Sequence, residues 1–282
     1  MTRSVAIAIV LVVAAIAYVA LLRGSSKWDF PAERSFGDEG LNVATVHVYL
    51  EPIGINSVAE SIQVRVSVAS TKAGDEAPVS EHDLYLLLEH DNIVERIDIR
   101  AHQPAPSRTI DLDLSDGDVR DYPLDTYHAA LSVRGFLVSG RDAPATLAPV
   151  RVTVWQRVLG FRLQTKELPA GAQGASNLAI EIHRNIAIIF FVLAAYGAMA
   201  LLALGALTIG TLVFLKIRRP EPTLTGALAG IVFALPALRN ALPGGAPLGV
   251  SADIFVFLWA ELAAVLAITM LIAMWARTGP RP

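Results

Sequence analysis

The 282-residue chain contains no cysteine, which excludes disulfides, thiolate metal sites and cysteine nucleophiles. Its net charge is only −3, so we expect no nucleic-acid partner. It also lacks a GxSxG nucleophile elbow, a phosphate-binding loop and an HExxH zinc motif. Its six histidines form no close HxH or HxxxH pair of the kind that binds a metal. We therefore predict a protein that is not an enzyme and has no cofactor.

Apolar residues, in contrast, make up 54% of the chain and concentrate at its two ends. Residues 5–22 form an uncharged run of 18 residues, longer than the roughly 7–15 residues of a signal-peptide core. No Ala-x-Ala-like cleavage site follows, so we interpret residues 1–23 as a retained transmembrane anchor, with a cleaved signal peptide as the alternative. Residues 185–282 predict three more transmembrane helices, at about 186–215, 223–240 and 253–276.

Small residues in the first of these three helices suit close contact between helices. They are Ala194, Ala195, Gly197, Ala198, Ala203, Gly205, Ala206 and Gly210.

Basic residues predict the orientation of these helices. Lys216, Arg218 and Arg219 follow the second of the four apolar segments, and Arg277 and Arg281 follow the last. Basic loops stay on the cytoplasmic side, so both termini should be cytoplasmic and the segment between them extracytoplasmic. The predicted localisation is therefore a multi-pass protein of the cell membrane, with the lipid bilayer as a partner.

Residues 24–184 predict an extracytoplasmic β domain. Apolar and polar residues alternate from Val58 to Val68, which indicates a strand with one buried face. Short strands divided by turn residues are typical of an antiparallel β-sandwich. We thus expect an α+β membrane protein with a β-sandwich-like domain and a four-helix transmembrane base. The other predicted strands are 43–50, 84–88, 93–99, 109–114, 127–133, 150–155 and 178–182.

A polar cluster interrupts the last two apolar segments. Asp253 and Glu261 share a helical face, and Glu261 lies about 12 Å deeper along the helix. A carboxylate at lipid depth needs a partner, and we predict Arg239 as the partner of Glu261, supported by Asn240. The pair is either a structural clamp between two helices or a proton or substrate site. The predicted cluster comprises Arg239, Asn240, Asp253, Trp259 and Glu261.

An acidic segment in the β region raises the question of a calcium site, since calcium prefers several carboxylate oxygens. Its spacing does not fit the helix–loop–helix calcium motif, because Tyr122 stands where a bidentate glutamate belongs. Leu112 and Leu114 instead indicate a strand with its acids facing solvent. We predict no metal site, and the candidates for the alternative are Asp111, Asp113, Asp116 and Asp118.

A turn motif follows, formed by Tyr122, Pro123, Asp125 and Tyr127. Proline fixes φ and aspartate bonds nearby backbone, so the motif predicts a corner before a strand. The motif is loosely similar to an aromatic–Pro–apolar–Asp turn of pentameric ligand-gated channels. Those channels place all four helices after the sandwich and carry loop cysteines that this chain lacks.

The motif LPALRNALPGGAPLG at 235–249, followed by Asp253 and FLWAE at 257–261, resembles family 4436 of the domain-of-unknown-function series. The turn at 122–127 also fits that family. The resemblance implies a bacterial integral membrane protein with one anchor helix, an exported β domain and three closing helices. It assigns no activity and no catalytic residue.

These features predict an integral membrane protein of unknown biochemical activity. We expect a non-enzymatic accessory or sensing subunit of the cell envelope, which binds a partner or lipid-like ligand outside the cell. That partner is either another membrane protein or a second copy of this chain. The alternative is an oligomeric pore or transporter that uses Arg239, Asp253 and Glu261.

Overall fold

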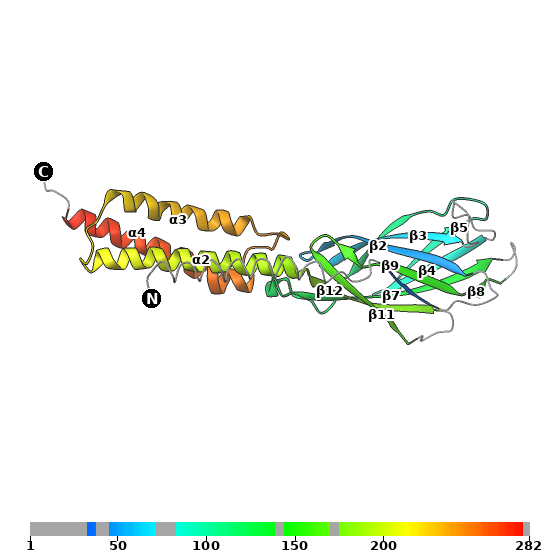
Figure 1. The fold of residues 1–282 in the computed structure, drawn as a ribbon. Helices are drawn as coiled ribbons and strands as arrows, with labels where there is room; N and C mark the ends of the chain where they lie inside the picture. Colours follow the sequence, from blue (N-terminus) through cyan, green and yellow to red (C-terminus); the bar gives the residue numbers. More distant parts are fainter. Residues whose placement is uncertain (1–32, 38–44, 71–82, 139–143, 170–174, 279–282) are drawn as a thin grey trace, which may run out of the picture. The chain divides into compact units, whose positions relative to one another are not determined.

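The computed structural model describes residues 33–37, 45–70, 83–138, 144–169 and 175–278, in two compact units (Figure 1). The β unit comprises the described residues up to Gly117 together with Thr126–Ala187. The helical unit comprises Asp118–Asp125 and the described residues from Ile188 onward. The predicted anchor at 1–23 lies outside the described residues.

The β unit contains two sheets. In the first sheet all neighbouring strands are antiparallel except β2 and β9, which run parallel. Its strand order is β1 (Glu33–Phe36), β9 (Val150–Trp155), β2 (Val46–Asn56), β3 (Ser61–Ser70) and β6 (Arg108–Asp113).

The second sheet is antiparallel throughout its described pairings. Its order is β10 (Arg157–Val158), β11 (Phe161–Leu168), β12 (Ala175–Arg184), β7 (Thr126–Val138), β4 (Asp83–His90) and β5 (Ile93–Ile99), with β8 (Thr146–Ala148) paired to β7.

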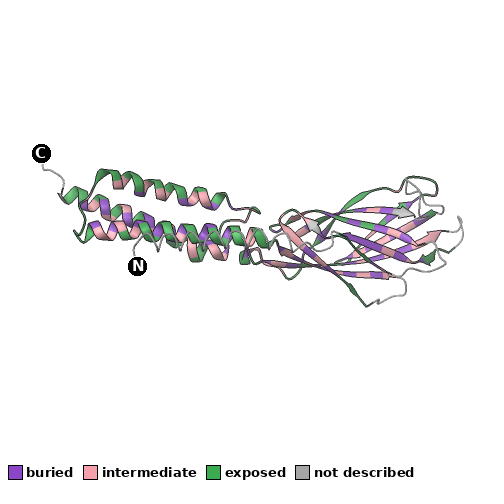
Figure 2. Ribbon diagram, viewed as in Figure 1, coloured by how far each residue is buried: buried purple, intermediate pink, exposed green. Residues whose placement is uncertain are grey.

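One hydrophobic cluster contains the buried apolar residues of both sheets. The predicted alternation in β3 is confirmed, because Ile62, Val64 and Val66 are buried while the residues between them are not (Figure 2). Leu86 from β4 and Leu131 from β7 join the same cluster. The period of two in the sequence therefore identified the inward face of these strands.

Three helices follow the β unit, as predicted: α2 (Ile186–Phe214), α3 (Pro222–Asn240) and α4 (Leu258–Thr278). A single π-helical turn, η2 (Asp253–Phe257), leads into α4. Three helical segments, the last of them combining η2 and α4, are long and apolar enough to cross a membrane. The fourth predicted helix falls in residues 1–23 and so lies outside the described part of the chain.

Helix α2 buries one narrow stripe and exposes the rest of its apolar surface. Its buried residues recur at steps of one, three and four, as expected for one helical face. Of the small residues predicted for helix contact, Ala195, Ala203, Ala206 and Gly210 are buried, and the others are not. The buried stripe is Val192, Ala195, Tyr196, Met199, Ala203, Ala206, Gly210 and Val213.

Helices α2 and α4 approach each other closely at Gly210 and Ala267. A Cβ atom added to Gly210 would lie 2.8 Å from the Cα atom and 2.9 Å from the backbone oxygen of Ala267. The backbone atoms of Ala267 can move only together with α4, so Gly210→Ala should push the two helices apart. We expect this to lower the free energy of unfolding by about 1–3 kcal/mol. Thermal unfolding of the full chain in detergent measures this effect.

Gly205→Ala is the matched control, because an added Cβ there meets nothing within 4 Å. It should change stability by less than about 1 kcal/mol. Equal unfolding temperatures for the two variants would contradict the close contact at Gly210.

Candidate functional site

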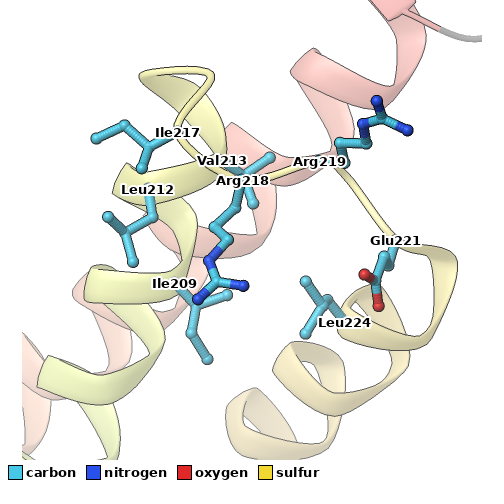
Figure 3. A pocket seen from close by; sticks show the side chains of 8 residues that line it. All are labelled: Ile209, Leu212, Val213, Ile217, Arg218, Arg219, Glu221 and Leu224. Atoms are coloured by element: carbon cyan, nitrogen blue, oxygen red, sulfur yellow. The ribbon is translucent and has the colours of Figure 1, made fainter.

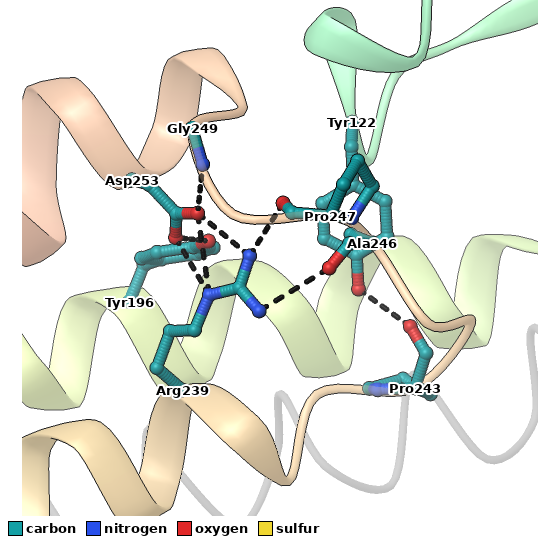
Figure 4. Close-up of polar contacts among 8 residues, drawn as sticks. All are labelled: Tyr122, Tyr196, Arg239, Pro243, Ala246, Pro247, Gly249 and Asp253. Carbon is teal, nitrogen blue, oxygen red and sulfur yellow. Dashed lines mark hydrogen bonds and ion pairs between the residues drawn. The ribbon is translucent and has the colours of Figure 1, made fainter. Parts of the chain in front are cut away.

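A buried ion pair joins the end of α3 to the start of η2. Nη2 of Arg239 lies 2.6 Å from Oδ2 of Asp253, and Nε of Arg239 donates to Oδ1 at 3.0 Å (Figure 4). The two side chains are only 8% and 6% exposed. Arginine fits this two-point contact because its donors form a planar fork that matches a carboxylate.

The remaining hydrogen-bonding groups of the pair also have partners. The Tyr196 hydroxyl from α2 donates to Oδ1 of Asp253 at 2.7 Å, and the Gly249 N–H donates to Oδ2 at 3.1 Å. Arg239 also donates to the backbone oxygens of Ala246 and Pro247, at 3.2 and 2.7 Å. All three guanidinium nitrogens are therefore used, which is the condition under which a buried pair can be tolerated.

These contacts determine the path of the linker at 241–252. Gly244, Gly245 and Gly249 have φ values of 87°, 58° and 97°, in the left-handed region that glycine adopts without a steric cost. The linker can therefore fold back so that two of its carbonyls point at Arg239 (Figure 4). The arginine thus holds the loop that follows its own helix.

The turn motif is divided between the two units. Tyr122 is 2% exposed and belongs to the hydrophobic cluster of the helical unit, where its hydroxyl donates to the Pro243 oxygen at 2.6 Å. Pro123 and Asp125 lie in the same segment of the helical unit, whose short 3-10 helix is η1 (Val119–Asp121). Tyr127, in contrast, is fully buried in the core of the β unit.

The predicted pairing of Arg239 with Glu261 is wrong, because Asp253 is the partner of Arg239. The fold-back of the linker brings Asp253 to the end of α3. The π-helical turn is wider than an α-helical turn, so it changes the direction in which later residues of α4 face. Asp253 and Glu261 therefore do not share a face as closely as they would in a regular α-helix, which the sequence prediction assumed. Oε2 of Glu261 is buried and has no hydrogen-bond partner among the described residues. Asn240 is exposed and Trp259 is 64% exposed.

Two family models match the chain. Residues 37–182 match Domain of unknown function (DUF4436), which is more than half of the chain. The chain belongs to the DUF4436 family. Residues 184–278 match a second model, Domain of unknown function (DUF8686), and no curated protein matches the chain.

The two matches divide the sequence motifs of this DUF4436 protein. The turn at 122–127 lies within the DUF4436 match, whereas the motif at 235–249 lies within the DUF8686 match. The sequence resemblance to family 4436 is confirmed, although its more distinctive residues belong to the second model. Arg239, Asp253 and Tyr196 all fall in that second region.

The acidic segment does not gather its carboxylates around one point. Asp111 and Asp113 lie on the exposed face of β6, while Leu112 and Leu114 are buried as predicted. No group of three or more acidic or histidine side chains suited to a metal occurs within the described ranges.

Asp118 already has a cationic partner in its own segment. Nη2 of Arg120 lies 2.6 Å from Oδ2 of Asp118. This hydrogen-bonded guanidinium lowers the pKa of the Asp118 carboxyl below its ordinary value. Asp118 also caps η1 by accepting the Arg120 N–H. Its position is explained by local contacts.

Tyr196 and the carbonyls of the linker belong to the site but were not predicted from the sequence. Tyr196 is the only tyrosine in α2, and a hydroxyl in an apolar helix is a usable signal for an interhelical hydrogen bond. The Ala246 and Pro247 carbonyls carry no such signal, because every residue has one. Only the folded path of the linker identifies them.

The ion pair predicts non-additive stability effects. Asp253→Leu alone should cost about 3–5 kcal/mol, because it leaves the Arg239 charge buried without a counterion. The double change Arg239→Met with Asp253→Leu should cost less than either single change, since no charge then remains buried. Chemical unfolding of the full chain in detergent measures the coupling.

Glu261→Gln is the matched control, because that carboxylate lies on the same helical segment and forms no ion pair with Arg239 among the described residues. It should leave the Arg239–Asp253 coupling unchanged. Purely additive single and double changes would refute a coupled pair.

Proposed function

We propose that this DUF4436 protein is a non-enzymatic accessory or sensing subunit of the cell envelope. In this proposal the β unit is a β-sandwich-like domain outside the cell, on a four-helix transmembrane base whose two termini are cytoplasmic. The β unit binds a membrane-protein partner, a second copy of the chain or a lipid-like ligand. Binding to the β unit changes the conformation of the helical unit through the segment Asp118–Asp125.

The surface of the helical unit supports insertion in a bilayer. Helix α2 exposes Phe191, Leu201 and Leu204 on its outer side while it buries apolar residues on its inner side (Figure 2). A helix that is apolar all round suits lipid rather than water. Basic residues gather after α2 and at the end of α4, which favours a cytoplasmic location for that end. Arg281 lies outside the described residues.

Two turns of the β unit carry exposed apolar side chains, which supports the proposal that this end of the β unit faces the membrane. Gly160 accepts a hydrogen bond from the Asn185 N–H, and Ser57 accepts one from Arg184, so both turns lie where β12 ends. The neighbouring residues Leu159 and Val58 are 99% and 62% exposed. Apolar side chains at loop tips suit the boundary of a bilayer better than bulk water.

The observation that carries the sensing proposal is the packing of the segment Asp118–Asp125, through Tyr122, with the residues of the helical unit. This segment packs with the helices, whereas the residues on either side of it, Gly117 and Thr126, belong to the β unit. The chain therefore passes between the units at 117–118 and 125–126, in addition to the passage at 187–188. Tyr122 bonds the linker whose other end is held by Arg239. A conformational change in the β unit on binding can thus be transmitted along the chain to the segment Asp118–Asp125, and through Tyr122 to the α3–α4 linker.

The first test asks whether a partner exists. The full chain, purified from its own membranes in mild detergent, should elute as a complex larger than a monomer by size exclusion with light scattering. A monomer with no protein or lipid-like ligand bound would refute the proposal.

The second test measures coupling in a chain without native cysteine. A maleimide should label Leu248→Cys in the exposed part of the linker at a rate that changes when the partner binds. Tyr122→Phe should abolish that change, because it removes the hydroxyl that donates to Pro243 and keeps the ring. Val94→Cys, exposed on β5, is the control whose labelling should not depend on Tyr122. An unaltered response in Tyr122→Phe would refute this route of coupling.

Glu261 favours a second candidate, an oligomeric pore or transporter. Its buried oxygen has no hydrogen-bond partner among the described residues, and ionisable groups within apolar helices often serve transport. Arg239 and Asp253, in contrast, are engaged with each other. If the protein is a pore or transporter, Glu261→Gln should reduce ion flux in liposomes. Glu221→Gln, directly before the first residue of α3, should not reduce it. Flux that survives Glu261→Gln would exclude this carboxylate.

A further inference from the structure

A cavity of about 600 Å³ opens at the opposite end of the helical unit from the Arg239–Asp253 pair. It lies between the last turns of α2 and the first turn of α3 (Figure 3). Ile209, Leu212 and Val213 of α2 and Leu224 of α3 form its apolar walls. The volume falls within the roughly 300–1,000 Å³ of small-molecule sites.

The α2–α3 connection adds charged groups to this apolar space. The guanidinium of Arg218 points into the space between the helices, beside Ile209, and that of Arg219 points away from it (Figure 3). Glu221 is the one acidic residue of the lining. The described residues include no hydrogen bond or ion pair to the side chain of Arg218, so its donors are available to a ligand.

The position of Arg218 relative to the apolar walls indicates what kind of ligand fits. The walls belong to helices long and apolar enough to cross a membrane, and the arginine lies just beyond their end. A ligand with an apolar chain and an anionic head would therefore match both parts of the cavity at once. The positive charge of Arg218, whose guanidinium points into the space between the helices, complements a phosphodiester monoanion.

We propose that this cavity binds the headgroup of an anionic phospholipid of the phosphatidylglycerol class. Arg218 holds the phosphodiester through charge-assisted hydrogen bonds, for which the arginine fork is well suited. One acyl chain lies against Ile209, Leu212 and Leu224. Basic sites between transmembrane helices at the end of the bundle are a recurring way to recognise anionic headgroups.

This site extends beyond the proposed sensing function, and it rests on that proposal only for membrane insertion. Binding to the purified chain in detergent does not depend on the β unit or on its partner. Extraction of the chain from membranes by alkaline carbonate would refute membrane insertion, on which both proposals rest. Loss of the lipid preference in a chain that resists this extraction would refute the cavity site alone, and a monomer without a bound partner or ligand would refute the sensing function alone.

Native mass spectrometry of the full chain in detergent tests the site, with phosphatidylglycerol and phosphatidylcholine as probes. The wild-type chain should retain phosphatidylglycerol in preference to phosphatidylcholine. Arg218→Gln should weaken phosphatidylglycerol binding by about tenfold, the usual size of a lost charge-assisted contact. Arg277→Gln is the matched control, because it removes the same charge in the last turn of α4 from a residue that does not line the cavity.

A second variant tests the apolar part of the site. Leu224→Trp should fill the cavity and reduce phosphatidylglycerol binding without removing a charge. Equal retention of the two lipids, or equal effects of Arg218→Gln and Arg277→Gln, would overturn the proposal. Displacement of the lipid by millimolar inorganic phosphate would also overturn it, since the acyl chain would then contribute nothing to recognition.

Discussion

The buried contact between Arg239 and Asp253 is the constraint on which the geometry of the helical unit depends. Removing two charges from water is costly, and their attraction compensates only when every remaining donor and acceptor is satisfied. Here Tyr196, the Gly249 N–H and two linker carbonyls complete the set. The pair can therefore form only with α2, α3, the linker and η2 in one arrangement.

In the bilayer that we propose around these helices, apolar packing alone would not specify that arrangement. Lipid tails are as apolar as leucine, so burying a leucine between helices gains little over exposing it to lipid. The contact of Gly210 with Ala267 adds close van der Waals packing between α2 and α4, but it does not orient the linker. The directional hydrogen bonds of Arg239 do so, and they place the linker whose Pro243 carbonyl accepts from Tyr122.

Patterns that depend on one element at a time were predictable from the sequence. The alternation of β3 identified its buried face, and the apolar runs identified α2, α3 and α4. Strand β11 was not delimited, because only Leu163 and Thr165 are buried within it and its polar residues conceal the period.

The candidate site was only partly predictable, because its partners come from different elements. The sequence places Arg239 and Asp253 in one polar cluster, but helical spacing favours Glu261 as the partner of Arg239. That prediction is wrong because the glycine-containing linker folds back and brings Asp253 to Arg239, and because a π-helical turn changes the direction in which Glu261 faces. The division of the turn between Tyr122 and Tyr127 likewise follows from tertiary packing, since both are buried aromatic residues five positions apart.

The two ends of the helical unit illustrate how one type of side chain serves different purposes. Arg239 directs every nitrogen of its guanidinium to a partner within the chain, so it has little capacity left for a ligand. Arg218 points its guanidinium into a cavity with apolar walls, where no described residue forms an ion pair or hydrogen bond with it. Saturated donors rigidify a structure, whereas unsaturated donors beside apolar surface create affinity for an amphipathic anion. The satisfaction of hydrogen bonds, rather than the presence of charge within an apolar region, therefore separates the structural arginine from the ligand-binding one.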